Sequence, residues 1–232
     1  MATPDLFWDR FYTSNRREFF KDRHWLLREF SVLKTDNIIL CELGCGVGNS
    51  TFPLLEENAT LKVFCSDFSA SAVTLLRVDE LFAKYGDRIL ACCVADCSVP
   101  EQVLSSVPAG GCDAVLLVFV LSAMPLAVMK GVVASARAVL RVGGVVLVRD
   151  YASNDATQLR FEQNPGSRRL DENLFCRGDG TQVFFFAPAV LQALWEEGGH
   201  FAALQCDEKT AEPAVAGGPL RRFVQGVFEK RE

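Results

Sequence analysis

The sequence predicts an α/β protein with one mostly parallel, seven-stranded sheet that carries helices on both faces. From residue 38 onward, short apolar runs alternate with helix-length segments, as expected for parallel strands joined by right-handed crossovers. A glycine-rich turn follows the first of these runs directly. After the fifth run the alternation stops for some thirty-five residues, which indicates a functional insertion after the fifth strand.

The elements are predicted in chain order as follows. Thr3 caps a first helix that starts at Pro4 and presents Phe7, Trp8, Phe11 and Tyr12 on one face. Buried strands are predicted at 38–43, 61–65, 89–95, 114–120 and 145–149, with helices near 49–58, 69–84, 100–107 and 125–140.

The insertion is expected to contain a hairpin, with strands at 173–176 and 183–186 and Asp179-Gly180 at its turn. A helix at 188–198 ends on Gly198-Gly199, and strands near 200–206 and 222–228 close the sheet. The 232 residues suit a single domain (1–232). Its parts are an aromatic and basic helical segment (1–34), a first half of the sheet (35–150), the insertion (151–187) and a closing helix with strands (188–232).

Composition excludes several classes of protein. A net charge of −5 argues against nonspecific coating of nucleic acid, although both chain ends carry a small positive excess. Two histidines and nine cysteines without a C-x-x-C pair disfavour a metal centre or a disulfide framework. No apolar stretch is long enough for a membrane span, and no secretory signal is recognisable. We therefore expect a protein without metal or membrane contact, in the cytoplasm or also in the nucleus.

The segment 41–49 (CELGCGVGN) is the main functional signal, because its glycines allow a tight turn and close approach of a ligand. Asp67 ends the second strand, where a carboxylate can bind two ribose hydroxyls. Asp96 follows the third strand, placed for an adenine amino group, and Val118 belongs to the fourth. All of these positions fall at the carboxyl edge of the predicted sheet, where such folds bind ligands.

Simpler interpretations exist for each position: Gly44 can belong to a plain turn, and each aspartate can cap a helix. The spacing differs from that of dinucleotide-binding turns, and Glu42 before the glycines matches class I methyltransferases. The expected cofactor is therefore S-adenosyl-L-methionine, released as S-adenosyl-L-homocysteine. Replacing Asp67 is expected to weaken cofactor binding with little effect on the stability of the free protein.

Five segments together resemble a known family: 19–25 (FFKDRHW), 42–49, 119–123 (FVLSA), 149–151 (RDY) and 177–181 (RGDGT). In this order they are similar to the eukaryotic methyltransferase-like enzymes that form 3-methylcytidine in the anticodon loop of tRNA. The resemblance runs from about residue 6 to residue 228 and implies a Rossmann-like class I methyltransferase fold. It departs at 174–177 (LFCR), where the family tends to have FYVR, so the choice of tRNA stays open.

The resemblance implies roles for particular residues and partners. Its cofactor contacts match Trp8, Tyr12, Gly44, Asp67, Asp96, Cys97 and Val118. The partner is the tRNA anticodon loop, with an aminoacyl-tRNA synthetase or another tRNA-recognition protein as a further candidate.

Methylation of cytosine N3 leaves a cationic base, so a carboxylate, Asp150, is a candidate for stabilising its charge. Because N3 lies on the pairing edge, the base must be unpaired or extruded. The candidates for stacking are Tyr151, Phe19 and Phe20, and those for phosphates or ordering are Arg23, Arg149 and Arg177.

The aromatic residues among these candidates can equally be core packing, and Arg149 and Asp150 an ion pair. The alternative functions are methylation of a small molecule or protein side chain, a non-catalytic binding subunit, and an NAD-dependent oxidoreductase.

Overall fold

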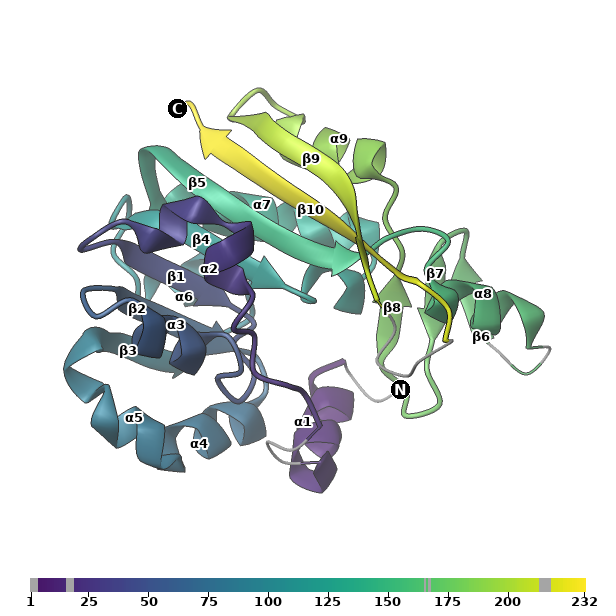
Figure 1. Cartoon of the computed structure of the whole chain (residues 1–232), viewed down its shortest axis with the longest axis horizontal. Helices are drawn as coiled ribbons and strands as arrows, with labels where there is room; N and C mark the ends of the chain where they lie inside the picture. The colour runs from purple at the N-terminus through teal and green to yellow at the C-terminus, as the bar shows by residue number, and fades with distance from the viewer. Residues whose placement is uncertain (1–3, 16–18, 165, 167, 213–217) are drawn as a thin grey trace.

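The computed structural model describes residues 4–15, 19–164, 166, 168–212 and 218–232. Its centre is a seven-stranded sheet of order β3-β2-β1-β4-β5-β10-β9 (Figure 1). The strands are, in that order, Ile89–Val94, Lys62–Asp67, Ile39–Leu43, Cys112–Val118, Leu140–Tyr151, Arg221–Lys230 and Phe201–Ala211. The first five pair in parallel, and β10 runs antiparallel to both β5 and β9. The predicted seven-stranded, mostly parallel sheet is confirmed.

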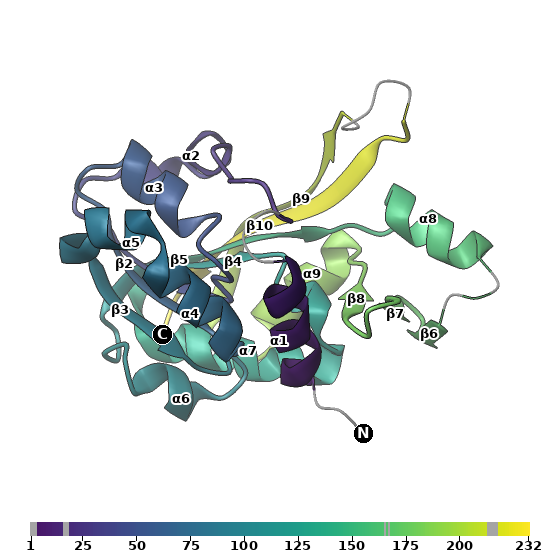
Figure 2. The same cartoon turned by 90° about the horizontal axis from the view of Figure 1, so that it is seen from below.

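Helices cover both faces of this sheet, as Figure 2 shows from below. One face carries α2 (Leu26–Glu29), α3 (Thr51–Glu57) and α4 (Ala70–Val78); the other carries α6 (Pro100–Leu104), α7 (Leu126–Val139) and α9 (Pro188–Glu196). Each face buries its own apolar cluster: Phe30, Phe52 and Leu76 lie in one, and Met129, Val132 and Trp195 in the other. Burial on both faces explains why the strands appear as continuous apolar runs.

The helix predicted at 69–84 is two helices, α4 and α5 (Glu80–Lys84). Asp79 separates them because its backbone is extended (φ −68°, ψ 140°) and its side chain accepts the Leu81 N–H as an N-cap. Short 3₁₀ turns lie at Ser31–Lys34, Gly86–Arg88 and Leu121–Ala123. Within the described ranges, every helix is too short or too polar to be a membrane span.

The insertion forms a small unit of its own beside the main sheet (Figure 1). The predicted hairpin is confirmed as β7 (Leu174–Cys176) and β8 (Gln182–Phe184), and the Asp179 carboxylate accepts the Thr181 N–H at the turn. A helix, α8 (Ala156–Gln163), and a third strand, β6 (Arg168–Asp171), lie where the sequence suggested no element. Asp155 caps α8, whose polar surface conceals it from hydrophobic periodicity.

The first helix, α1 (Pro4–Asn15), lies between the main sheet and the insertion (Figure 2). Its predicted cap, Thr3, lies outside the described residues. Trp8, Phe11 and Tyr12 pack on the main body, whereas Phe7 contacts the hairpin turn at Gly180, where an added Cβ would approach its ring to 2.4 Å. One aromatic face of α1 therefore touches both parts of the protein.

Candidate active site

The glycine turn after β1 holds three left-handed glycines: Gly44 (φ 76°), Gly46 (φ 54°) and Gly48 (φ 91°). These conformations are strained for any other residue. A Cβ at Gly46 would also lie 2.5 Å from the Tyr12 hydroxyl, so α1 closes directly over the turn. The turn is therefore built for close approach, as the sequence predicted.

Asp67 lies at the end of β2 with both carboxylate oxygens engaged. One accepts the Gly46 N–H at 2.8 Å and the other accepts the Ser69 N–H at 2.9 Å. Burial raises the pKa of Asp67 to about 6. Asp67 thus shapes the glycine turn and the start of α4. Because two buried N–H groups depend on it, we expect its loss to lower stability as well as cofactor affinity.

A cavity of about 160 Å³ brings together the residues expected around the adenosine. It is lined by Asp67, Asp96, Cys97, Trp8, Tyr12 and Gly44, together with apolar residues between β4 and the start of α7. One Asp96 oxygen accepts hydrogen bonds from the Ser98 N–H and hydroxyl, at 2.8 and 2.7 Å. Asp96 therefore holds a local turn rather than capping a helix, since the N-cap of α6 is Val99, and it lines the cavity.

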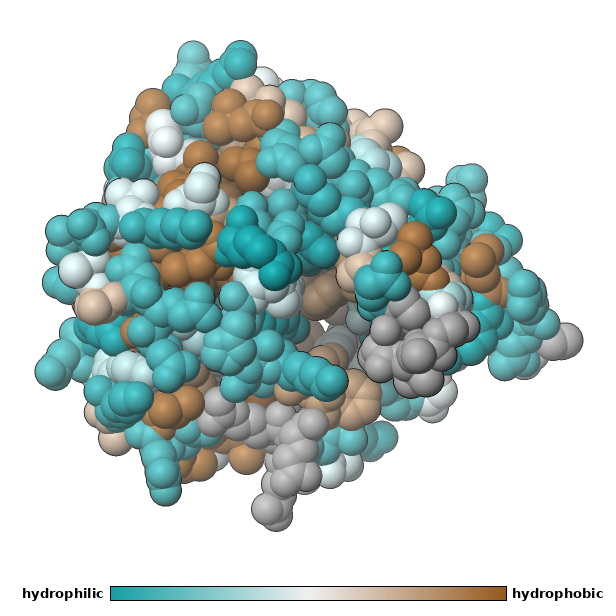
Figure 3. All heavy atoms as spheres, viewed as in Figure 1, coloured by the Kyte–Doolittle hydropathy of each residue, from teal (hydrophilic) through white to brown (hydrophobic). Residues whose placement is uncertain are grey.

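A second cavity of about 260 Å³ adjoins the first, and Trp8, Tyr12, Gly44 and Phe119 line both. It contains Val118 and five of the residues predicted to face the substrate: Phe19, Phe20, Arg23, Arg177 and Tyr151. Figure 3 shows a hollow between the main body and the insertion. Segments as distant in the chain as Trp8 and Arg221 meet at this point.

Two arginines of this cavity were not found by sequence reasoning. Arg160 reaches it from α8 and Arg221 from the start of β10. The Arg221 guanidinium lies 5.9 Å from the Tyr151 ring centre and is held by the fully buried Asp155 carboxylate at 2.9 Å. No local motif marks either residue. Arg221 comes to lie beside Tyr151 because β10 pairs with β5, which is a contact between distant parts of the chain.

Aromatic rings and cations alternate around Tyr151. Its ring lies 4.8 Å from that of Phe119, and Arg177 approaches it to 5.8 Å. Arg23 approaches the Phe119 ring to 5.5 Å and donates a hydrogen bond to the Ser50 hydroxyl at 3.1 Å. Such a wall suits a flat, electron-rich ring beside an anionic group.

Glu42, which the sequence marked as typical of class I methyltransferases, lies buried beneath the glycine turn. Burial raises its pKa to about 7, and the Thr51 hydroxyl donates to it at 2.5 Å. The carboxylate supports the turn from below.

The residues of the 149–151 segment have different surroundings. Tyr151 lines the second cavity, whereas Asp150 is fully buried, with its oxygens accepting the Ser122 and Tyr151 N–H groups at 2.9 Å each. Arg149 lines neither cavity; its guanidinium pairs with Glu29 at 3.6 Å. Arg149 therefore does not form the suggested ion pair with Asp150. The prediction that Arg149 contacts the substrate directly is also wrong, because the side chain lines neither cavity.

Among the described residues, no group of His, Cys, Asp or Glu side chains is arranged to hold a metal ion.

The sheet order, the glycine turn and the strand-end carboxylates define a class I S-adenosylmethionine-dependent methyltransferase.

Comparisons with known proteins lead further. A family model described as a methyltransferase domain matches residues 41–146. The mouse protein tRNA N(3)-cytidine methyltransferase METTL6 is 39% identical over 199 residues, covering 83% of this chain and 68% of its own. The Schizosaccharomyces pombe tRNA N(3)-methylcytidine methyltransferase trm141 is 34% identical over 232 residues, covering 96% and 91%. The chain belongs to the tRNA N(3)-cytidine methyltransferase family.

Solved structures support the fold independently of sequence. A SAM-dependent methyltransferase from Anabaena variabilis superposes with a TM-score of 0.72 at 14% identity, covering 100% of this chain and 96% of that one. Because the sequences have diverged so far, this likeness concerns the architecture alone.

Proposed function

We propose that this enzyme methylates N3 of a cytidine in the anticodon loop of tRNA. The observation that carries the proposal is the second cavity, in which Tyr151, Phe119 and several arginines meet directly beside the glycine turn. Rings suit an unpaired base and arginines suit its flanking phosphates. The relatives of this chain are named as tRNA N(3)-cytidine methyltransferases, which agrees with a cytidine of tRNA as the substrate.

The cofactor site fits S-adenosylmethionine. The first cavity ends at two strand-end carboxylates, Asp67 and Asp96, and a Cβ at Gly44 would fill the space beside Val120 at 2.5 Å. Asp67 would hold the ribose hydroxyls and Asp96, with Cys97, the adenine edge. Trp8 and Tyr12 would cover the cofactor from α1, with Val118 at the floor of the second cavity. When bound there, the cofactor supplies a methyl group on a sulfonium for in-line displacement.

The protein's own residues orient the acceptor. Tyr151 and Phe119 line the cavity that would receive the extruded cytosine, and Phe19 and Phe20 from the N-terminal segment line the same cavity. Arg177 and Arg221 flank Tyr151 and place cations where the neighbouring phosphates would lie. Alignment of this kind supplies a large share of the rate, since cytosine N3 is a neutral lone pair that needs no strong base.

A direct test is methyl transfer to unmodified tRNA, read by mass spectrometry of the nucleosides. We expect 3-methylcytidine in tRNA and no methylation of peptides or small acceptors, and a tRNA with uridine at the target position should stay unmodified. Adding an aminoacyl-tRNA synthetase tests whether such a partner is required. Binding of the cofactor without transfer to any tRNA would instead support a binding subunit.

Trp8→Ala should weaken S-adenosylmethionine binding roughly tenfold, about 1.4 kcal/mol, because the ring borders both cavities. Its edge contact with Phe11, at 5.3 Å, gives it a structural role as well. Calorimetry measures the affinity, and thermal unfolding with and without cofactor separates the two roles. If Trp8 only packs, added cofactor will protect the variant from heat as well as it protects the parent.

A further inference from the structure

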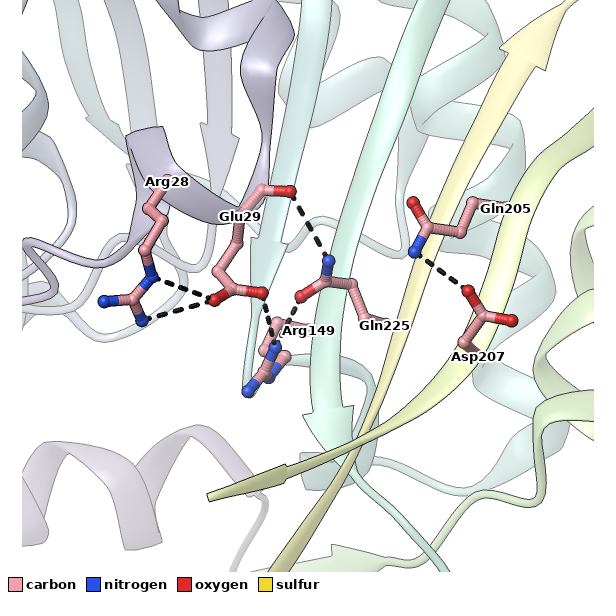
Figure 4. Close-up of polar contacts among 6 residues, drawn as sticks. All are labelled: Arg28, Glu29, Arg149, Gln205, Asp207 and Gln225. Atoms are coloured by element: carbon pink, nitrogen blue, oxygen red, sulfur yellow. Dashed lines mark hydrogen bonds and ion pairs between the residues drawn. The ribbon is translucent and has the colours of Figure 1, made fainter. Parts of the chain in front are cut away.

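Arg149 is buried and forms a polar network with Glu29 and Gln225 (Figure 4). Its guanidinium carbon is 5.1 Å from the centre of the Trp25 ring and 4.9 Å from that of Phe223, so the planar group lies between two aromatic rings. The same group donates a hydrogen bond to the side-chain amide oxygen (Oε1) of Gln225 and forms an ion pair with Glu29 at 3.6 Å. Four side chains thus contact the Arg149 guanidinium, and both of its polar contacts involve Nη1.

These partners come from three separate parts of the chain. Trp25 and Glu29 belong to the N-terminal segment, Arg149 lies on β5, and Gln225 is its register partner on β10. The Gln225 amide also reaches the Glu29 carbonyl oxygen at 3.5 Å (Figure 4). Within the described residues, Arg149 therefore ties the N-terminal segment to the sheet.

The two aromatic residues in contact with Arg149, Trp25 and Phe223, both lie near residues that line the second cavity. Trp25 is two residues from Arg23, whose side chain lines the cavity and whose N–H donates to the Asn49 carbonyl at 2.8 Å. On the other side, the Phe223 ring lies 6.3 Å from Tyr151 and 5.7 Å from Phe119. A shift at Arg149 would thus move groups on two walls of the cavity.

The chemistry favours arginine at this position. A guanidinium can stack on rings with its faces while its edge donates hydrogen bonds, which an ammonium cannot do. Burial lowers the pKa of Arg149 and the Glu29 carboxylate acts against that shift. Removing one partner of such a network leaves the other partner's polar atoms poorly paired.

We infer that Arg149 is a positioning residue for the methyl transfer: its planar side chain, held between Trp25 and Phe223, sets the places of Arg23 and Tyr151 around the target base. The inference rests on the proposed function. The cofactor cavity should be unaffected, because Arg149 borders neither cavity and the glycine turn is held separately by Asp67.

The test compares Arg149→Met and Arg149→Lys with a matched pair of glutamine variants. Gln225→Leu removes a network member. Gln205→Leu makes the same change on β9, where the side chain donates to Asp207 at 2.9 Å and, among the described residues, has no contact with the network (Figure 4). For each folded variant we would measure cofactor affinity, kcat and KM for tRNA, and hydrogen exchange of residues 19–30.

Arg149→Met should lower kcat by about tenfold to a hundredfold, as small displacements of reacting groups do. Cofactor affinity should stay within about threefold of the parent, and residues 19–30 should exchange faster while β1 and β4 stay protected. Gln225→Leu should shift the same quantities less, and Gln205→Leu should leave them unchanged. Arg149→Lys should retain the ion pair but not restore kcat, since lysine lacks the planar group.

Parental kcat and KM in folded Arg149→Met, or full rescue by lysine, would overturn the inference. If Arg149→Met does not fold, Gln225→Leu against Gln205→Leu decides in the same way. If the parent itself transfers no methyl group to tRNA, the proposed function fails. Hydrogen exchange then still tests whether Arg149 holds the N-terminal segment on the sheet, and unchanged exchange of residues 19–30 in Arg149→Met would overturn that part of the inference.

Discussion

Asp150→Asn should lower kcat for tRNA methylation by about a hundredfold or more, on the scale seen when an electrostatic group aimed at developing charge is removed. The buried carboxylate lies at the end of β5, adjacent to Tyr151, and each oxygen accepts one backbone N–H. An amide offers one acceptor and one donor, so either the Ser122 or the Tyr151 N–H would face an NH₂ group. Single-turnover transfer on unmodified tRNA measures the effect, with cofactor and tRNA affinities expected to remain near parental.

The pH dependence gives an independent check on Asp150. Burial raises its pKa to about 6, so kcat of the parent should fall as the pH drops below about 6 and the carboxylate takes up a proton. The folding stability should depend on pH in the opposite direction to kcat. Because the pKa of Asp150 is higher in the folded than in the unfolded protein, its protonation stabilises the fold below the unfolded-state pKa of roughly 4, and this contribution is lost as the pH rises through about 6. Asp150→Asn should lack the acidic fall in kcat; a near-parental rate would end the catalytic proposal.

Asp67→Ala should weaken S-adenosylmethionine binding by about a hundredfold or more, because two charge-assisted hydrogen bonds to the ribose are worth roughly 1.5–3 kcal/mol each. The loss of the Gly46 and Ser69 acceptors adds to this by loosening the glycine turn. Calorimetry at neutral pH measures the affinity. Since the pKa of Asp67 is also about 6, the parent's cofactor affinity should decline below that pH.

Thermal unfolding of Asp67→Ala without cofactor needs a matched control. Asp113 is a suitable control because it lies near the start of β4, at the edge of the sheet opposite to Asp67. Its carboxylate accepts the Ile39 N–H at 2.8 Å and pairs with Arg141. Asp113→Ala should also lose stability, but it should bind the cofactor as the parent does. Equal affinities for the two variants would contradict the assignment of Asp67.

The alternation of strands and helices in the main sheet, the glycine turn and the carboxylates at strand ends could be predicted from the sequence, whereas α8 and β6 of the insertion could not. Each depends on a local property: apolar runs mark strands buried on both faces, glycine permits left-handed backbone, and parallel strands bring their carboxyl ends to one edge. The convergence of Asp67 and Asp96 on one cavity therefore follows from the sequence. The motif resemblance extended this to Trp8 and Tyr12.

The tertiary structure decided which side chains meet. Arg149 and Tyr151 are two residues apart on one strand, yet the first is enclosed by Trp25 and Phe223 and the second faces the cavity. That difference arises because β10 pairs with β5 and the N-terminal segment packs over one end of the pair. Arg221 enters the site through the same pairing. Contacts between distant segments leave no periodic trace in the chain, because they depend on how whole elements pack rather than on the residues beside them in sequence.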